Sequence, residues 1–185
     1  MRWLIHALKR FRRGEDGSVV AEAVIALPLM VWAYLGLYVY WDAFRAVNLA
    51  QKASYTVADY LSRERGTLTN AELNGMATVF QYMMDSDQET KMRITSLYWN
   101  PARKRFEVYW SRSPGNTMTP LTNTTLQALT DRIPAMSDGD SAILLETEAS
   151  YSAAFNVGVT DQVFTNFIVT RPRFLTRICL ENTTC

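Results

Sequence analysis

The chain has 185 residues, enough for one ordinary domain with an added segment, and its 48% hydrophobic and 12% aromatic content excludes a disordered polar chain. The net charge of +1 conceals an asymmetry: five basic residues face two acidic ones in the first 17 positions, whereas the remainder holds 14 basic and 16 acidic residues. Because no basic surface is predicted in that remainder, nucleic acid is not expected as a partner.

The first predicted element is an apolar segment from Ser18 to Trp41, which follows a basic leader at residues 1–17. As a helix its 24 residues would be about 36 Å long, more than the roughly 30 Å of bilayer hydrocarbon. The basic leader predicts a cytoplasmic N-terminus, with residues 42–185 forming a periplasmic head. A cleaved secretory signal peptide is the alternative, but the apolar stretch is longer than a usual signal core and no convincing cleavage site follows it.

One acid, Glu22, stands on the second turn of this apolar segment. An ionised carboxylate costs about 2.5 to 3.5 kcal/mol at the centre of a membrane helix, so it normally has a partner or lies shallow enough to reach the headgroups. Gly17 stands five residues before it, and the pattern G-x-x-x-x-E resembles the processing site of type IV pilin-like proteins. In that family a prepilin peptidase cuts after the glycine. The resemblance places the cut between Gly17 and Ser18.

Cleavage at this bond would create an ammonium group at Ser18, one helical turn from Glu22. The two charges would attract strongly in a medium of low dielectric constant, within one chain or between neighbouring chains. Glu22 is therefore interpreted as an assembly residue. Pro28 follows six residues later, where it removes a backbone hydrogen bond and is expected to kink the helix.

A second resemblance is more specific. The run V-V-A-E-A-V-I-A-L-P-L-M is similar to the A-V-E-F-A-L-x-x-P-L pattern of the TadE and TadF proteins of tight adherence (Flp) pilus systems, and Arg171-Pro-Arg-Phe174 resembles the C-terminal end of many members. Ala21 and Ala23 depart from that pattern, which often has valine and phenylalanine there, so the choice between TadE and TadF stays open.

This resemblance implies a minor pilin or pseudopilin of the bacterial inner membrane, with incorporation into the pilus as a further location, that supports pilus assembly and so adhesion. The implied partners are the prepilin peptidase, other pilins or pseudopilins, the pilus assembly platform and membrane lipid. No cofactor is implied.

Helical spacing continues beyond the membrane segment, through Val47, Ala50, Ser54, Val57 and Leu61 to Arg65-Gly66. One helix from Ser18 to about Arg65 would be roughly 70 Å long. Its alanine-rich face is expected to pack in the core of the head, with lateral contact to other subunits as the alternative. Thr69-Asn-Ala-Glu72 is a capping box that predicts a second helix to about Met84.

Four strands are predicted after the second helix, at Met92–Trp99, Phe106–Trp110, Ile143–Tyr151 and Val163–Thr170. The first two are joined by a hairpin across Asn100-Pro-Ala-Arg-Lys. In the third strand, Ile, Leu, Thr, Ala and Tyr alternate with Leu, Glu, Glu and Ser, so one face is expected to be wet. The predicted fold is α+β, a long N-terminal helix packed on an antiparallel four-stranded sheet, as in pilins.

The two cysteines, Cys179 and Cys185, stand near the C-terminal end. A metal site would need about four ligands, and the only histidine, His6, lies on the other side of the apolar segment. A disulfide between the two cysteines is expected, with free thiols as the alternative.

Catalytic activity is not expected, because the sequence has no Ser-His-Asp or Cys-His set, no phosphate-binding loop and no dinucleotide fingerprint. The acidic cluster Asp85-x-Asp87-x-Glu89 lacks the glycine turn of a calcium loop and is interpreted as solvated. The alternative to a pilus function is a single-pass, membrane-anchored periplasmic sensor or binding module, in which Glu22 is incidental. The sensor predicts an intact N-terminus, whereas the pseudopilin predicts a mature chain that begins at Ser18.

Overall fold

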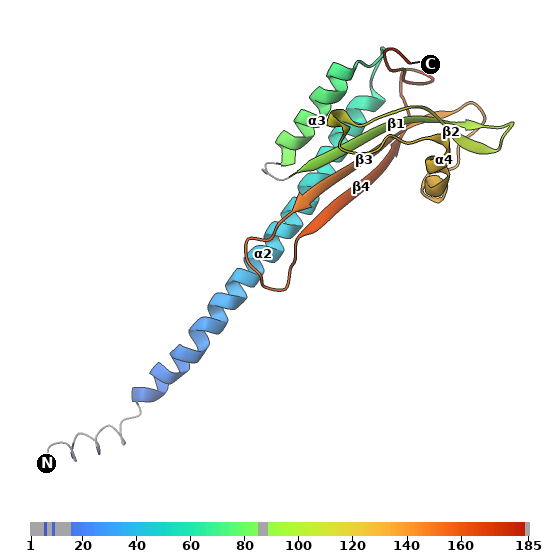
Figure 1. Ribbon diagram of the computed structural model, residues 1–185. Coiled ribbons are helices and arrows are strands. Elements are labelled where there is room, and N and C mark those ends of the chain that lie inside the picture. The colour runs from blue at the N-terminus through green and yellow to red at the C-terminus, as the bar shows by residue number, and fades with distance from the viewer. Residues whose placement is uncertain (1–5, 7–8, 10–15, 85–88, 184–185) are drawn as a thin grey trace. The chain divides into compact units, whose positions relative to one another are not determined.

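The structure is a computed structural model that describes residues 6, 9, 16–84 and 89–183. The chain divides into two compact units, Met1–Asp42 with Ala153–Val159, and Ala43–Ser152 with Thr160–Cys185. Figure 1 labels most of the elements, which in chain order are α2 (Asp16–Ser62), α3 (Asn70–Met84), β1 (Thr90–Asn100), β2 (Arg105–Arg112), η1 (Pro114–Asn116), α4 (Asn123–Leu126), η2 (Gln127–Arg132), β3 (Ser141–Tyr151) and β4 (Gln162–Thr170). The predicted α+β fold is confirmed.

The N-terminal helix α2 is continuous over 47 residues, as predicted, although it ends slightly before the expected Arg65. Its end is fixed by local hydrogen bonds. The Arg63 amide still reaches the carbonyl of Asp59, and the Glu64 carboxylate then accepts the amides of Arg65 and Gly66 at 2.8 and 3.1 Å. These side-chain acceptors draw the chain out of the helix and into the loop that leads to α3.

Helix α3 begins at the predicted capping box. The Thr69 hydroxyl accepts the amide of Glu72 at 3.2 Å, and the Glu72 carboxylate accepts the amide of Thr69 at 2.7 Å. The next amide, that of Asn70, donates to the Glu181 carboxylate at 2.7 Å. Two segments far apart in sequence therefore share the start of this helix, which is consistent with the preference of helix N-termini for negative charge.

The four predicted strands are confirmed, each within two residues of the expected bounds, and form one antiparallel sheet in the order β2-β1-β3-β4. Strands β1 and β2 make the predicted hairpin, in which Asn100 pairs with Arg105. A bulge at Ser96/Leu97 shifts the register of this pair. Strands β3 and β4 pair over nine residues without a shift.

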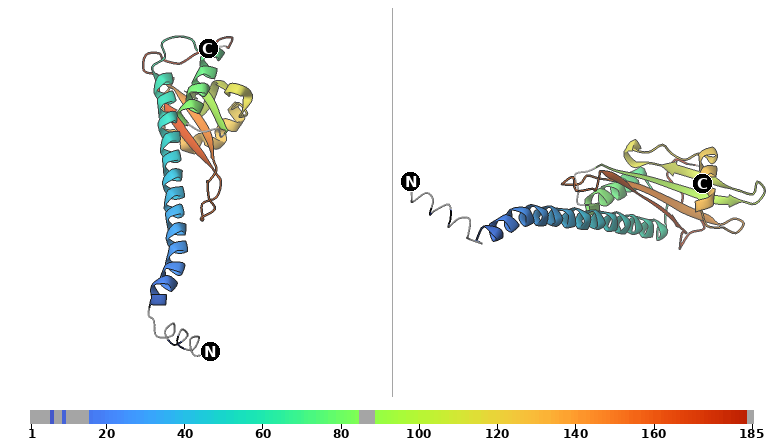
Figure 2. Two further views of the ribbon diagram at one scale, coloured as in Figure 1. Left: turned by 90° about the vertical axis from the view of Figure 1, so that its left-hand side faces the viewer. Right: turned by 90° about the horizontal axis from the view of Figure 1, so that it is seen from below.

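One face of the sheet packs against the second part of α2 and against α3 (Figure 2). We call this the helix-side core; α2 contributes Ala50, Ala53, Val57, Ala58 and Leu61, α3 contributes Leu73, Met76, Phe80 and Met84, and the strands contribute Met92, Ile94, Trp110, Ile143, Leu145 and Ala149. The expected core role of the alanine-rich face of α2 is confirmed. Small side chains let the helix approach the sheet closely, so that the Ser54 hydroxyl lies 2.8 Å from that of Thr147 on β3.

The opposite face of the sheet holds a second cluster, the loop-side core, made of Leu97, Phe106, Leu121, Leu126, Ile133, Ala142 and Leu144. The expectation that one face of β3 is wet holds only for the second half of the strand, where Glu146, Glu148 and Ser150 are partly exposed between buried neighbours. Leu144 is completely buried, because α4 and η2 cover this face, and residues Ser141 to Leu145 are all buried. The covering segment was not predicted, because its helices are too short to show a clear hydrophobic period.

Candidate processing and assembly site

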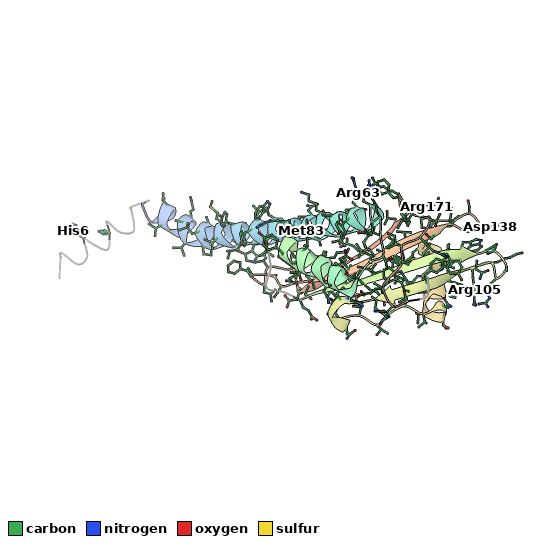
Figure 3. All side chains as sticks on the ribbon, turned by 90° about the horizontal axis from the view of Figure 1, so that it is seen from above. His6, Arg63, Met83, Arg105, Asp138 and Arg171 are labelled. Atoms are coloured by element: carbon green, nitrogen blue, oxygen red, sulfur yellow. The ribbon has the colours of Figure 1, made fainter. Side chains whose placement is uncertain are left out.

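The first part of α2 is an apolar helix whose side chains are exposed. An 18-residue window of this helix has a mean hydropathy of 1.9 and none of it is buried, and Figure 3 shows its side chains projecting from the helix. Val19, Leu27 and Trp32 are 69%, 60% and 61% exposed. In the described part of the chain this is the one helix long and apolar enough to cross a membrane. The predicted anchor thus has the length and surface that lipid requires.

Gly17 and Ser18 lie in the first turn of this helix. A Cβ atom built on Gly17 would have no heavy atom within 4 Å, so close packing does not require glycine here. Glycine also disfavours a helix by about 1 kcal/mol relative to alanine. Packing in the described part of the chain therefore does not account for this glycine. A peptidase that needs an extended substrate would have to unwind this turn first.

Glu22 is exposed and lies on α2 four residues after Ser18. Residues at this spacing share one face of a helix, one turn apart. An amine created at Ser18 would therefore lie next to the Glu22 carboxylate along the helix. The helix supplies the spacing that the predicted ion pair requires.

Pro28 lies within α2, which continues through it. The residue is exposed, as are its neighbours Leu27 and Leu29. The helix therefore accommodates the missing backbone donor without ending. The expected kink stays a prediction.

Aromatic side chains mark the C-terminal end of the apolar segment. Tyr38, Tyr40 and Trp41 are 44%, 51% and 60% exposed. The Phe155 ring, from the β3–β4 connection, packs edge-on against Tyr38 with ring centroids 6.4 Å apart. Such rings prefer the boundary between hydrocarbon and water, which is where the predicted span places this end of the segment.

The structure describes only one of the two cysteines of the predicted disulfide. Cys179 is disulfide-bonded. Cys185 lies outside the described residues, so the pairing of the two cysteines stays a prediction. The acidic cluster at residues 85–89 also falls largely outside the described part.

Among the acids of the head that the structure describes, Glu107 has the most strongly shifted pKa, and no sequence motif pointed to it. Its side chain is 5% exposed and accepts hydrogen bonds from Asn100 and Tyr98 at 2.8 Å and from Arg103 and Arg105 at 2.9 Å. The bonds from Asn100 and Tyr98, reinforced by the two arginines, lower the pKa of Glu107 to about 2. The same carboxylate raises the pKa of Tyr98.

This arrangement explains the basic run at the hairpin. Arg103 and Arg105 belong to the basic run Arg103-Lys104-Arg105. Figure 3 places Arg105 near the end of the hairpin. The two arginines hold a buried acid rather than offering charge to a polyanion. Every side-chain donor to Glu107 comes from the hairpin itself, so the cluster stabilises the hairpin.

A half-buried ion pair joins the two central strands. Arg93 on β1 and Glu146 on β3 are register partners, and the guanidinium contacts both carboxylate oxygens, at 2.7 and 2.8 Å. Their side chains are 14% and 12% exposed. Arg93 also donates to the carbonyl of Thr119 at 2.6 Å. This pair anchors the segment that covers the sheet, which accounts for an acid on the face predicted to be wet.

The C-terminal motif Arg171-Pro-Arg-Phe174 contacts the end of α2 and the sheet. Arg173 forms an ion pair with Asp59 at 2.9 Å, and its amide donates to the carbonyl of Ser62 at 2.8 Å. The guanidinium of Arg65 lies 4.3 Å from the centre of the Phe174 ring. These contacts explain the motif through packing, because it fastens the chain to the last turn of α2.

A shallow apolar groove between α2 and α3 is lined by Thr56, Val57, Tyr60, Glu72, Gly75, Met76 and Val79. Its one charged residue, Glu72, already caps α3. In the described residues no group of three or more His, Cys, Asp or Glu side chains is placed to hold a metal ion. Comparison with protein-family models, curated proteins and solved structures finds no match to this chain.

Proposed function

We propose that this protein is a minor pilin or pseudopilin of a tight adherence (Flp) pilus system, processed by a prepilin peptidase and used to support pilus assembly. The observation that carries the proposal is the joint placement of Gly17 and Glu22 at the start of an exposed apolar helix. The fold does not need the glycine, and an apolar span does not favour the acid. Both are explained if the chain is cut between Gly17 and Ser18.

The proposed mechanism has two steps. The leader at residues 1–17 directs the apolar segment into the inner membrane with its basic residues in the cytoplasm. Cleavage then removes the leader and leaves a positive amine at Ser18, which neutralises Glu22 of its own or a neighbouring subunit. Because this attraction is strong in the hydrocarbon, it fixes how subunit helices align along the membrane normal.

The head contributes recognition rather than catalysis in this proposal. Its clusters of polar side chains, at Glu107 and at Arg93 with Glu146, are saturated by partners within the fold. The functional surfaces are then the apolar helix and the exterior of the head, which would contact other pilins or pseudopilins and the assembly platform. The proposed role of the molecule is therefore to contact other subunits.

The decisive experiment is to determine the N-terminus of the protein isolated from its native host, by mass spectrometry. We expect a chain that begins at Ser18. Gly17→Leu should block the cut and leave the full leader attached. Gly36→Leu is the matched control, because Gly36 also lies in α2 and a Cβ there would also have no atom within 4 Å.

The control variant should be processed like the wild type. A chain that still begins at Met1 while the peptidase is present and active would contradict the pilus proposal. That result would favour the membrane-anchored sensor, which keeps its leader.

A further inference from the structure

The sheet has an open edge at β4. This strand pairs with β3 along all nine of its residues, and it is the last strand in the sheet order (Figure 1). In the described part of the chain, no backbone hydrogen bond joins β4 to anything except β3. Every second residue of an edge strand turns its N–H and C=O groups outward, so β4 presents a row of groups that another strand can pair with.

The other edge of the same sheet is closed. On β2, the amide of Val108 donates to the Asn123 side chain at 2.7 Å, and the carbonyl of Phe106 accepts from the Gln127 side chain at 2.9 Å. Both side chains come from the segment α4–η2. Strand β2 also begins and ends with arginine and carries the extra residue of the bulge, Tyr109, opposite Ser96/Leu97. These are devices by which natural proteins prevent edge pairing.

Strand β4 has none of these devices. Its sequence, QVFTNFIVT, contains no charged residue and no proline, and its pairing with β3 has no bulge. None of its residues is buried. Phe164 and Ile168 nevertheless pack against the helix-side core, and Phe167 and Val169 against the loop-side core. A further strand paired with β4 would bury more of the β4 side chains on both faces of the sheet.

The residues that flank β4 define what fits there. Asp161 precedes the strand and Arg171 follows it, and Arg171 remains 59% exposed although it pairs with Asp140. In an antiparallel pairing the start of one strand lies opposite the end of the other. A partner strand that also has an acid before it and a base after it would place opposite charges together at both ends.

We propose that the β4 edge binds a strand of a second protein chain, which runs antiparallel to β4, is uncharged along its length, and is preceded by an acid and followed by a base. A second copy of this chain carries that pattern. Pairing β4 with β4, however, would point the two α2 helices in opposite directions, which two chains anchored alike in one membrane do not allow. That last exclusion rests on the proposed function, whereas the open edge does not.

The test uses a labelled peptide with the sequence of residues 161–171 and the full chain in detergent, with fluorescence anisotropy as the readout. We expect saturable binding with one peptide per chain. Thr165 is exposed at the middle of β4, and Thr165→Lys should weaken binding by about tenfold or more, because a lysine on an edge strand opposes pairing. Thr124→Lys, the same change on α4 beside the closed edge, should bind like the wild type.

Orientation is tested with a second peptide in which the first and last residues are exchanged. This peptide would place like charges opposite Asp161 and Arg171, and we expect it to bind about three- to tenfold more weakly. Equal affinity for the two peptides would overturn the antiparallel pattern. Absence of saturable binding, or unchanged binding by a folded Thr165→Lys variant, would overturn the site itself.

If circular dichroism shows that Thr165→Lys unfolds the head, Val163→Lys replaces it, since that side chain is 56% exposed. The peptide assay does not depend on cleavage of the leader. The open edge and the pilus proposal can therefore fail separately. Only the edge proposal fails if the chain begins at Ser18 and the peptide does not bind. Only the pilus proposal fails if the peptide binds and the chain begins at Met1.

Discussion

At the scale of single residues, Glu107 shows how the head tolerates a buried acid. Four side chains donate to its carboxylate, and all four lie within the hairpin that carries it. Leaving a buried carboxylate without donors would be costly, which explains why the hairpin keeps two arginines near its tip. The basic run is therefore part of the stability of the fold.

This arrangement predicts a dependence of stability on pH. The pKa of Glu107 falls from an ordinary 4.5 to about 2 in the folded head. A group that binds its proton less tightly when folded stabilises the fold above its unfolded pKa and loses that contribution as the pH falls through its folded pKa. The stabilisation is therefore complete above about pH 5 and mostly lost at pH 2.

Glu107→Gln isolates this effect, because other acids titrate alike in both proteins. The variant should melt at a lower temperature than the wild type at pH 7, and more than half of that difference should disappear between pH 5 and pH 2, followed by circular dichroism in detergent. Arg112→Gln, an exposed arginine on the same strand, serves as a control and should show no such narrowing. A constant difference across this range would contradict the role of Glu107.

At the scale of elements, α2 changes character along its length. Residues 19–37 expose large apolar side chains, whereas from Ala50 onward a narrow small-residue face is buried. That face carries a hydrogen-bonded chain in which the Ser54 hydroxyl contacts both the carbonyl of Ala50 at 2.7 Å and the Thr147 hydroxyl at 2.8 Å. Asn166 on β4 donates to the same threonine at 3.3 Å. One polar chain thus connects the helix with two strands.

A double-mutant cycle measures this connection. Ser54→Ala and Thr147→Val should each lower the free energy of unfolding by about 0.5 to 1.5 kcal/mol, because each removes the hydrogen bond between the two buried hydroxyls. The double variant should cost less than the sum of the two, with a coupling of about 1 kcal/mol, measured by urea unfolding in detergent. Additive costs would mean that the two hydroxyls do not act together. Thr56→Ala, on the exposed side of α2, should change stability by less than about 0.5 kcal/mol.

At the scale of the whole molecule, the proposed function depends on how subunits meet in the membrane. Glu22→Ala should leave insertion and leader cleavage largely intact, because neither step needs the carboxylate. Association with other subunits should decrease about tenfold in co-purification from native membranes, since the amine at Ser18 would have lost its counter-charge. Glu22→Asp should restore part of that association. Co-purification of the alanine variant at the wild-type level would contradict the role of Glu22 in assembly.

The sequence predicted much of this molecule, for reasons that are visible in particular elements. The long helix, the capping box at Thr69 and the four strands depend on local periodicity and on local hydrogen bonds, so short-range patterns reveal them. The cover formed by α4 and η2 could not be predicted, because it is stabilised by distant contacts such as the bond from Gln127 to Phe106. The burial of Leu144, on the face of β3 that was expected to be wet, was missed for the same reason.

The candidate sites divide in the same way. Gly17, Ser18 and Glu22 could be singled out because their relation is one of spacing along a single helix. The cluster around Glu107 could not be predicted without the register of the hairpin and the directions of its side chains. The open edge at β4 could be recognised only from the order of strands in the sheet, which the sequences of the strands do not reveal.

The C-terminal segment has a consequence for how the head matures. Ile178 and Leu180 are 0% and 1% exposed in the helix-side core, the buried indole of Trp110 donates to the carbonyl of Ile178, and Leu180 forms a parallel bridge with Leu68. Synthesis from the N-terminus delivers this segment after all four strands, so the helix-side core cannot be completed until the last residues of the chain are free. Under the proposed function, a subunit would become competent to join others only after its C-terminal segment had followed the strands across the membrane.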